Sequence, residues 1–165
     1  MISFLQKNFQ FNYWANKQVL AALAEKPEVI EPDVWKNFSH IIHAEYLWLN
    51  RVMKNAAPKV DVWKIIAPDE LEMRLDNAAQ EWLLLMETFD DSHLQELCYF
   101  TNQNGESKEL TIMDIIQHLC FHGAHHRGQL LAILGQKYGI HLSLDYHIFV
   151  ENLQNNQDNL SDLFE

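Results

Sequence analysis

The residues that break helices and the residues that cross-link small proteins are both scarce in this sequence. Its 165 residues include five Gly, four Pro and two Cys. Few Gly and Pro favour long helices, because these two residues fit a helix interior least well. The two cysteines, Cys98 and Cys120, are too few for a disulfide framework. No apolar run approaches the roughly 18 residues that a membrane-spanning helix requires, so no such span is expected.

Positive charge is also in short supply. Twelve Lys and Arg stand against 23 Asp and Glu, which gives a formal net charge of -11. An acidic surface repels phosphate backbones and anionic lipids, so neither nucleic acid nor membrane is an expected partner. The first residues, MISFLQKNFQ, are amphipathic and lack the apolar centre of a secretory leader. We therefore expect a cytoplasmic protein, with residues 1–165 forming a single domain.

Apolar residues are plentiful by contrast, at 48% of the chain, which indicates a packed core. Their periodicity predicts four long helices over about 3–24, 34–53, 68–90 and 111–134, and a weaker helical or mixed tail over about 146–164. Ser3, Asp69 and Thr111 are the expected N-caps, and Gly135 is the expected stop of the fourth helix. Residues 97–111 predict a short hairpin that turns around Asn104-Gly105. The predicted class is thus all-α, a four-helix bundle with a short β-hairpin before the fourth helix.

Nine histidines are many for this length, and the densest group lies in the fourth predicted helix. At about 100° per residue, His122 and His126 fall one turn apart at the edge of the apolar face. That spacing lets two imidazole nitrogens bind one ion at about 2.0–2.1 Å. His118 and His125 fall further out, and Arg127 points almost to the opposite side. A helical pair of this kind often only packs and hydrogen-bonds, so the pair by itself does not establish a metal site.

Two further observations bear on metal binding. Gly123 and Ala124 are small, which leaves room beside the pair for a ligand or for a close helix. A third ligand must come from a neighbouring helix, and the second predicted helix offers His40 and His43, between which spacing does not choose. Imidazole ligands without a carboxylate suit zinc, nickel, cobalt, copper or iron and argue against a ferritin-like di-iron centre. The expected cofactor is one divalent transition metal, zinc, nickel or similar.

Two more residues are candidates for supporting this site. Gln129 follows His122 by seven residues and returns to the same face, where its amide can bond a ligand or a bound water. Trp48 follows His40 by eight residues and lies on nearly the same face, so it is a candidate pocket wall. Each also has an ordinary interpretation, as a solvated glutamine and as a core aromatic residue.

Three segments of the chain match a known pattern. They are NYWAN at 12–16, HIIHAEYLWL at 40–49 and HGAHHRGQ at 122–129. Together with the hairpin they resemble the DinB/YfiT-like family of metal-dependent helical-bundle proteins, over nearly the whole chain. The resemblance implies that His40, and not His43, joins His122 and His126 as the metal ligands. It also implies a homodimer.

The resemblance implies an activity as well. Some members of the family are transferases that use a low-molecular-weight thiol, which the metal activates as thiolate. We therefore expect a metal-dependent thiol transferase acting on a small thiol and an electrophile. One alternative is a non-catalytic metal-binding protein of a stress response. Another is a metal-dependent hydrolase, which would need a general base such as Asp114 or Glu45. No catalytic side chain is identified by the sequence itself.

Overall fold

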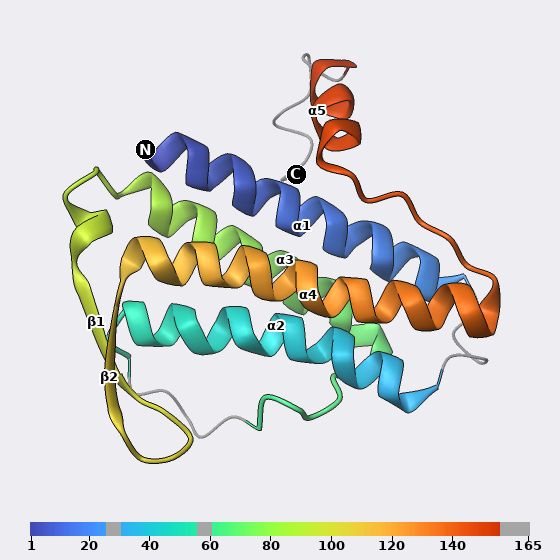
Figure 1. Ribbon diagram of the computed structural model, residues 1–165, viewed down its shortest axis with the longest axis horizontal. Coiled ribbons are helices and arrows are strands. Elements are labelled where there is room, and N and C mark those ends of the chain that lie inside the picture. Colours follow the sequence, from blue (N-terminus) through green and yellow to red (C-terminus); the bar gives the residue numbers. More distant parts are fainter. Residues whose placement is uncertain (26–30, 56–60, 156–165) are drawn as a thin grey trace.

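A computed structural model describes residues 1–25, 31–55 and 61–155 of the chain. Four long helices form the body of the molecule (Figure 1): α1 (Ile2–Ala24), α2 (Pro32–Val52), α3 (Pro68–Glu87) and α4 (Ile112–Tyr138). A short 3-10 turn η2 (His93–Gln95) and the strands β1 (Leu97–Thr101) and β2 (Ser107–Thr111) lie between α3 and α4. A fifth helix, α5 (Tyr146–Asn155), projects from the bundle beside α1. Of the tail predicted to be helical or mixed, residues 156–164 lie outside the described part.

The helices pack in the cyclic order α1, α3, α2, α4. Each of α1 and α2 contacts both α3 and α4. The predicted four-helix bundle is therefore confirmed, and α2 lies against α4, which is the pairing that the candidate metal site requires. None of the helices in the described ranges combines the length and apolarity needed to cross a membrane.

The predicted hairpin is also confirmed. β1 and β2 pair antiparallel from Leu97 opposite Thr111 to Thr101 opposite Ser107. The turn contains Gly105 at φ 80°, a backbone conformation that glycine adopts without strain. β2 leads directly into α4, where Thr111 caps the helix by accepting a hydrogen bond from the Asp114 backbone N–H at 3.1 Å.

Three predicted helix ends are wrong. Ser3 and Asp69 are not N-caps, because α1 begins at Ile2 and α3 begins at Pro68, so both residues lie inside a first turn. Pro68 explains the second case, since its fixed φ suits the first position of a helix. Gly135 does not end α4. The helix continues one turn to Gly139, which takes the left-handed conformation (φ 65°) that ends many helices.

The core has a polar layer between two apolar ends. The cluster nearer the hairpin includes Phe9, Trp48, Trp82 and Ile115, and the cluster at the other end includes Val19, Phe38, Leu71 and Leu130. Buried polar residues gather on α1, α2 and α4 where the two clusters meet: Asn12, Asn16, Ser39, His40, His43, Glu45, His126 and Arg127. Buried polar groups cost free energy unless they are bonded, so this layer is where functional chemistry is to be sought.

Candidate metal centre

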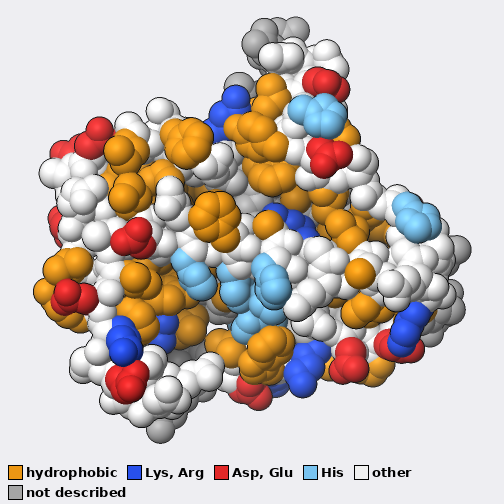
Figure 2. Space-filling model, in the orientation of Figure 1, with side chains coloured by type: hydrophobic (Ala, Val, Ile, Leu, Met, Phe, Trp, Pro, Cys, Tyr) orange, Lys and Arg blue, Asp and Glu red, His pale blue; other side chains and the backbone are white. Residues whose placement is uncertain are grey.

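Three histidines from two helices converge at the polar layer. His40 of α2, with His122 and His126 of α4, offer ligand nitrogens that all lie within 4.8 Å of one another. The ring centroids are 4.9 Å apart for His40 and His122, 4.7 Å for His40 and His126, and 4.4 Å for His122 and His126. Figure 2 shows histidine side chains gathered on one face of the molecule, open to solvent. The arrangement can hold one metal ion.

The loop before α3 fixes the orientation of His40. Its Nδ1 lies 3.0 Å from the backbone carbonyl oxygen of Val62. A carbonyl only accepts, so Nδ1 carries the proton and Nε2 of the neutral ring presents a lone pair. That Nε2 lies 3.1 Å from Nε2 of His122. Two nitrogens bound at about 2.0–2.1 Å to one tetrahedral ion would be about 3.3 Å apart, close to what is seen. A backbone carbonyl on the other ring nitrogen is the usual support of a ligating histidine.

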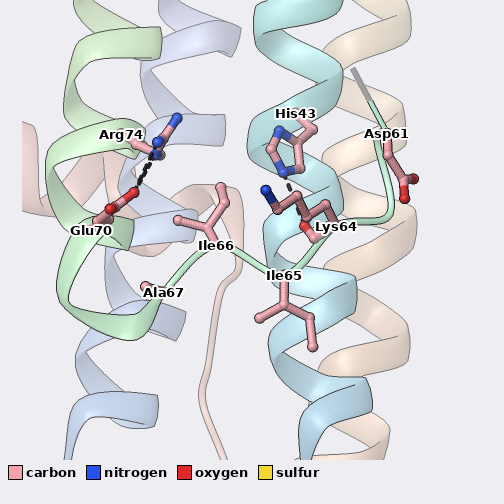
Figure 3. A pocket seen from close by; sticks show the side chains of 8 residues that line it. All are labelled: His43, Asp61, Lys64, Ile65, Ile66, Ala67, Glu70 and Arg74. Carbon is pink, nitrogen blue, oxygen red and sulfur yellow. Dashed lines mark hydrogen bonds and ion pairs between the residues drawn. The ribbon is translucent and has the colours of Figure 1, made fainter. Parts of the chain in front are cut away.

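His43 faces elsewhere. Its Nε2 donates to the backbone carbonyl of Lys64 at 3.0 Å. The same ring lines a cavity of about 500 Å³ between α2 and α3, where Arg74 is paired with Glu70 (Figure 3). Helical spacing does not distinguish His40 from His43, but their positions in the fold do. His40 lies beside His122 and His126, whereas His43 is hydrogen-bonded to the loop before α3.

Trp63 was not anticipated from the sequence. Its ring stacks on His40 with centroids 3.7 Å apart and planes 3° from parallel, and its centroid is 6.1 Å from that of His126. The loop that carries Trp63 is fixed to α2, because Ile66 N–H donates to Ser39 Oγ at 2.9 Å. Residues 61–67 have no helical spacing that relates them to the histidines. Only the folded loop reveals the contact.

The electrostatic environment keeps the three imidazoles neutral. Burial lowers the pKa of His40 and of His126. It lowers the pKa of His122 to about 3, with further depression from the neighbouring His126 and His40. Neutral imidazole is the form that binds metals. His126 Nδ1 is buried and has no hydrogen-bond partner in the described residues, and no carboxylate joins the group there. An all-nitrogen, uncharged donor set fits a zinc-type transition metal.

The outer histidines and the two support candidates lie around this centre. His118 and His125 are exposed, as predicted, with rings 5.5 Å from His122 and 5.2 Å from His126. The Trp48 ring contacts His118 at 5.6 Å, which places it one ring away from the three histidines. The Gln129 amide nitrogen lies 3.1 Å from Nε2 of His125.

The opposite side of α4 holds a buried hydrogen-bond network. Arg127 Nη1 donates to Asn12 Oδ1 at 2.6 Å and to Asn16 Oδ1 at 2.7 Å, and Asn12 Nδ2 donates to Glu45 Oε1 at 2.9 Å. Arg127 makes no direct bond to a carboxylate within the described residues, because the Asn12 amide stands between it and Glu45. Burial raises the pKa of Glu45 to about 8 and lowers that of Arg127 to about 10.

Gly123 is what allows this network. A Cβ at that position would overlap Asn12 Oδ1 and approach Arg127 Nη1 to 2.9 Å. Of the two small residues beside the histidine pair, Gly123 therefore admits a close helix, while Ala124 is exposed. The network joins α1, α2 and α4 at the level of His40, His122 and His126.

Comparison with known proteins places these features in a family context. A family model described as the DinB superfamily matches residues 14–130, which include all three histidines of the centre. The chain is also similar to Protein DinB of Bacillus subtilis (strain 168). The two are 22% identical over 169 residues, covering 91% of this chain and 95% of that protein.

Proposed function

Since the chain belongs to the DinB superfamily, we propose that it binds one divalent transition metal through His40, His122 and His126 and uses it in a thiol-dependent transfer reaction. The observation that carries the metal part is the convergence of three neutral imidazoles, one of which is held by a backbone carbonyl. The family membership agrees with the resemblance found in the sequence.

An open three-nitrogen site suits chemistry at a bound ligand. Three protein ligands leave at least one coordination position for water or substrate. A divalent ion held there supplies a Lewis acid that lowers the pKa of a bound thiol or water. The protein's own contribution is to keep the imidazoles neutral, to orient His40 through Val62 and to shield it from one side with Trp63. His122 is only half-buried, which leaves a route by which a small molecule reaches the centre.

The transferase proposal concerns a small thiol and an electrophile. In the transfer, the thiolate sulfur bonds to the electrophilic carbon, and the displaced group leaves with the bonding electrons. Cys98 and Cys120 do not compete for this role. Burial raises both thiol pKa values, that of Cys120 to about 12, so neither is a ready nucleophile. The thiol is therefore proposed to come from outside the protein.

The test is metal analysis followed by an activity screen. Protein as purified should contain about one equivalent of a transition metal, and His40→Ala, His122→Ala and His126→Ala should each lose it. His43→Ala is the matched control and should keep it. Metal-loaded protein is then incubated with cellular thiols, glutathione and bacillithiol among them, and a chromogenic electrophile. A rate no higher than that of the chelated protein would refute the transferase proposal while leaving metal binding intact.

The two alternatives predict different results. A hydrolase needs a base near the metal, yet Asp114 accepts the Thr111 hydroxyl at the start of α4, and Glu45 is enclosed in the network with Asn12. A non-catalytic protein with a structural ion would lose much of its thermal stability on chelation. A catalytic ion, by contrast, costs little stability when removed.

We further propose that residues 1–165 form one domain that acts as a homodimer in the cytoplasm. α1 and α4 both expose large apolar side chains, Phe4 at 60% and Phe121 at 70%, and exposed apolar area is typical of interfaces. Light scattering of the purified protein should give twice the mass of the 19.4 kDa chain. Phe121→Ser should shift the protein toward the monomer if α4 contributes to the interface.

A further inference from the structure

A second concave site lies on the other side of α4 from the three histidines. It is a groove of about 320 Å³ between α4, α1 and the segment that joins α4 to α5. Its apolar lining includes Phe11, Leu131 and Leu142. Ala124, Arg127 and Gly128 lie beside Leu131 on the α4 side. The volume lies at the lower end of the range for small-molecule sites.

Arg127 is a buried charge with no direct counter-charge. The residue is 3% exposed, and its Nη1 donates to the Asn12 backbone oxygen, Asn12 Oδ1 and Asn16 Oδ1, which are all neutral acceptors. Within residues 1–25, 31–55 and 61–155, no carboxylate forms an ion pair with it. Burying a charge without an opposite charge beside it is costly. An anion that reaches the guanidinium would therefore supply the missing counter-charge and bind favourably.

The guanidinium also has donors to spare. It carries five N–H groups, and those on Nε and Nη2 make no hydrogen bond to the described chain. Neither nitrogen is fully enclosed, because the enclosed side-chain atoms without partners in the described part of the chain are Asn16 Nδ2, Glu45 Oε2 and His126 Nδ1. Arg127 lines the groove and is otherwise buried. The groove is therefore where a ligand can reach these free donors.

We propose that this groove binds a small organic monocarboxylate, with the carboxylate on Nε and Nη2 of Arg127 and an apolar body against Phe11, Leu131 and Leu142. A side-on pair of N–H groups matches the two oxygens of a carboxylate. Asp145 at the rim selects the charge. It is exposed, its Oδ2 lies 3.2 Å from the Ser143 hydroxyl, and it disfavours a second negative charge at the mouth. This excludes dicarboxylates and phosphates of similar size. The site does not depend on the metal or on the proposed transferase activity.

In the experiment, hexanoate is titrated into the whole chain as purified, with its metal. Binding is measured by calorimetry and by amide chemical shifts. Hexylamine tests the charge and hexanedioate tests the role of Asp145. Ala124→Leu places a bulky side chain in the groove, and Ala21→Leu is the matched control, the same change at an exposed position of α1 away from the groove. Arg127→Gln removes the charge. Thermal melts and metal content establish that each variant is folded and loaded.

We expect saturable hexanoate binding that both variants weaken at least about tenfold. Arg127→Gln weakens it because a charge-assisted hydrogen bond or more is lost, and Ala124→Leu weakens it because the leucine side chain fills the groove. Ala21→Leu should bind as the wild type does, and hexylamine and hexanedioate should bind at least about tenfold more weakly. Chelated wild type should bind hexanoate unchanged, since the metal lies across α4. Equal affinity for Ala124→Leu, equal binding of hexylamine, or loss of binding on chelation would overturn the proposal. If Arg127→Gln does not fold, Ala124→Leu and the charge series decide.

Discussion

The two sides of α4 carry polar side chains from a single stretch, residues 122–127, with opposite properties. On the side that faces α2, His122 and His126 are uncharged and reach solvent through a half-buried ring. On the side that faces α1, Arg127 is charged and enclosed, and neutral amides of Asn12 and Asn16 hold its Nη1. The histidine side has lone pairs directed at a shared point. On the arginine side, Arg127 Nη1 donates to acceptors of a single helix, α1.

The difference separates two tasks. At most one proton lies between the facing Nε2 atoms of His40 and His122, and the buried Nδ1 of His126 has no partner in the described residues, so the histidine side can accept a ligand. Hydrogen bonds that link α4 to α1, and through Asn12 to Glu45 of α2, fix how the helices sit against each other. Changes on the histidine side should therefore alter metal binding and leave stability nearly intact. Changes on the arginine side should alter stability first.

The largest effect is expected for His122→Ala. Loss of one of three ligands should weaken metal binding at least about 100-fold. The unfolding temperature of the metal-free protein should scarcely change, because the His122 ring is half-buried and, among the described residues, its one hydrogen bond is to His40. Calorimetric titration with zinc and nickel measures the first, and thermal melts in chelator measure the second. His125→Ala, at an exposed position one turn from Gln129, is the control and should retain affinity.

On the arginine side, Glu45→Gln should show that ionisation of Glu45 lowers the free energy of unfolding of the wild type at high pH. The pKa of Glu45 is about 8 in the folded protein and near 4.5 when unfolded, so folding favours the protonated acid. The stability that this proton provides is fully present below about pH 4.5 and is lost as the pH rises toward 8. Gln keeps the acceptor for Asn12 and cannot ionise. The variant should match the wild type near pH 5 and exceed it by a few kcal/mol near pH 9 in urea unfolding.

The control for that experiment is Glu87→Gln, at an exposed position at the end of α3. It should shift the urea midpoint little at either pH. If Glu45→Gln were instead less stable than the wild type at both pH values, the carboxylate would be ionised in the fold and stabilising, and the described role of burial would be wrong.

Two glycines five residues apart test how closely α4 approaches α1. Gly123→Ala should destabilise the protein by about 1–3 kcal/mol, because the new methyl overlaps the Asn12 amide in a packed interior. Gly128→Ala is the matched change in the same helix. A Cβ there has no atom within 4 Å, so the higher helix propensity of Ala should stabilise by up to about 1 kcal/mol. Equal unfolding free energies for the two variants would show that α1 and α4 are not in close contact at Gly123.

Features that depend on one helix or one turn could be predicted from the sequence. Helical periodicity places His122 and His126 on the core edge and His118 and His125 outside, because the spacing along one helix is fixed by its geometry. The bundle and the hairpin follow from long amphipathic stretches and from the Asn104-Gly105 turn. The end of α4 was misjudged at Gly135, since two glycines four residues apart, at 135 and 139, both satisfy a helix-stop rule.

Contacts between elements could not be predicted in the same way. Nothing in the spacing distinguishes His40 from His43, because the distinction depends on which backbone carbonyl of the loop each ring meets, Val62 or Lys64. The partners of Arg127 are two amides of α1, and no spacing along α4 predicts them. Long-range partners depend on helix rotation and separation, and these are set by the packing of every side chain in the interface.

The smallest effect is expected for Trp63, whose contact with the centre is a stack and not a bond. Trp63→Ala removes the ring 3.7 Å from His40 but leaves the Val62 carbonyl in place. The His40 ring should become freer to rotate, and metal affinity should fall about three- to tenfold, less than for the loss of a ligand. Trp63→Phe keeps an aromatic stack and should restore most of the affinity. Competition with a chromogenic chelator measures both variants. Unchanged affinity in Trp63→Ala would show that the Val62 hydrogen bond alone orients His40, and that the indole only covers it.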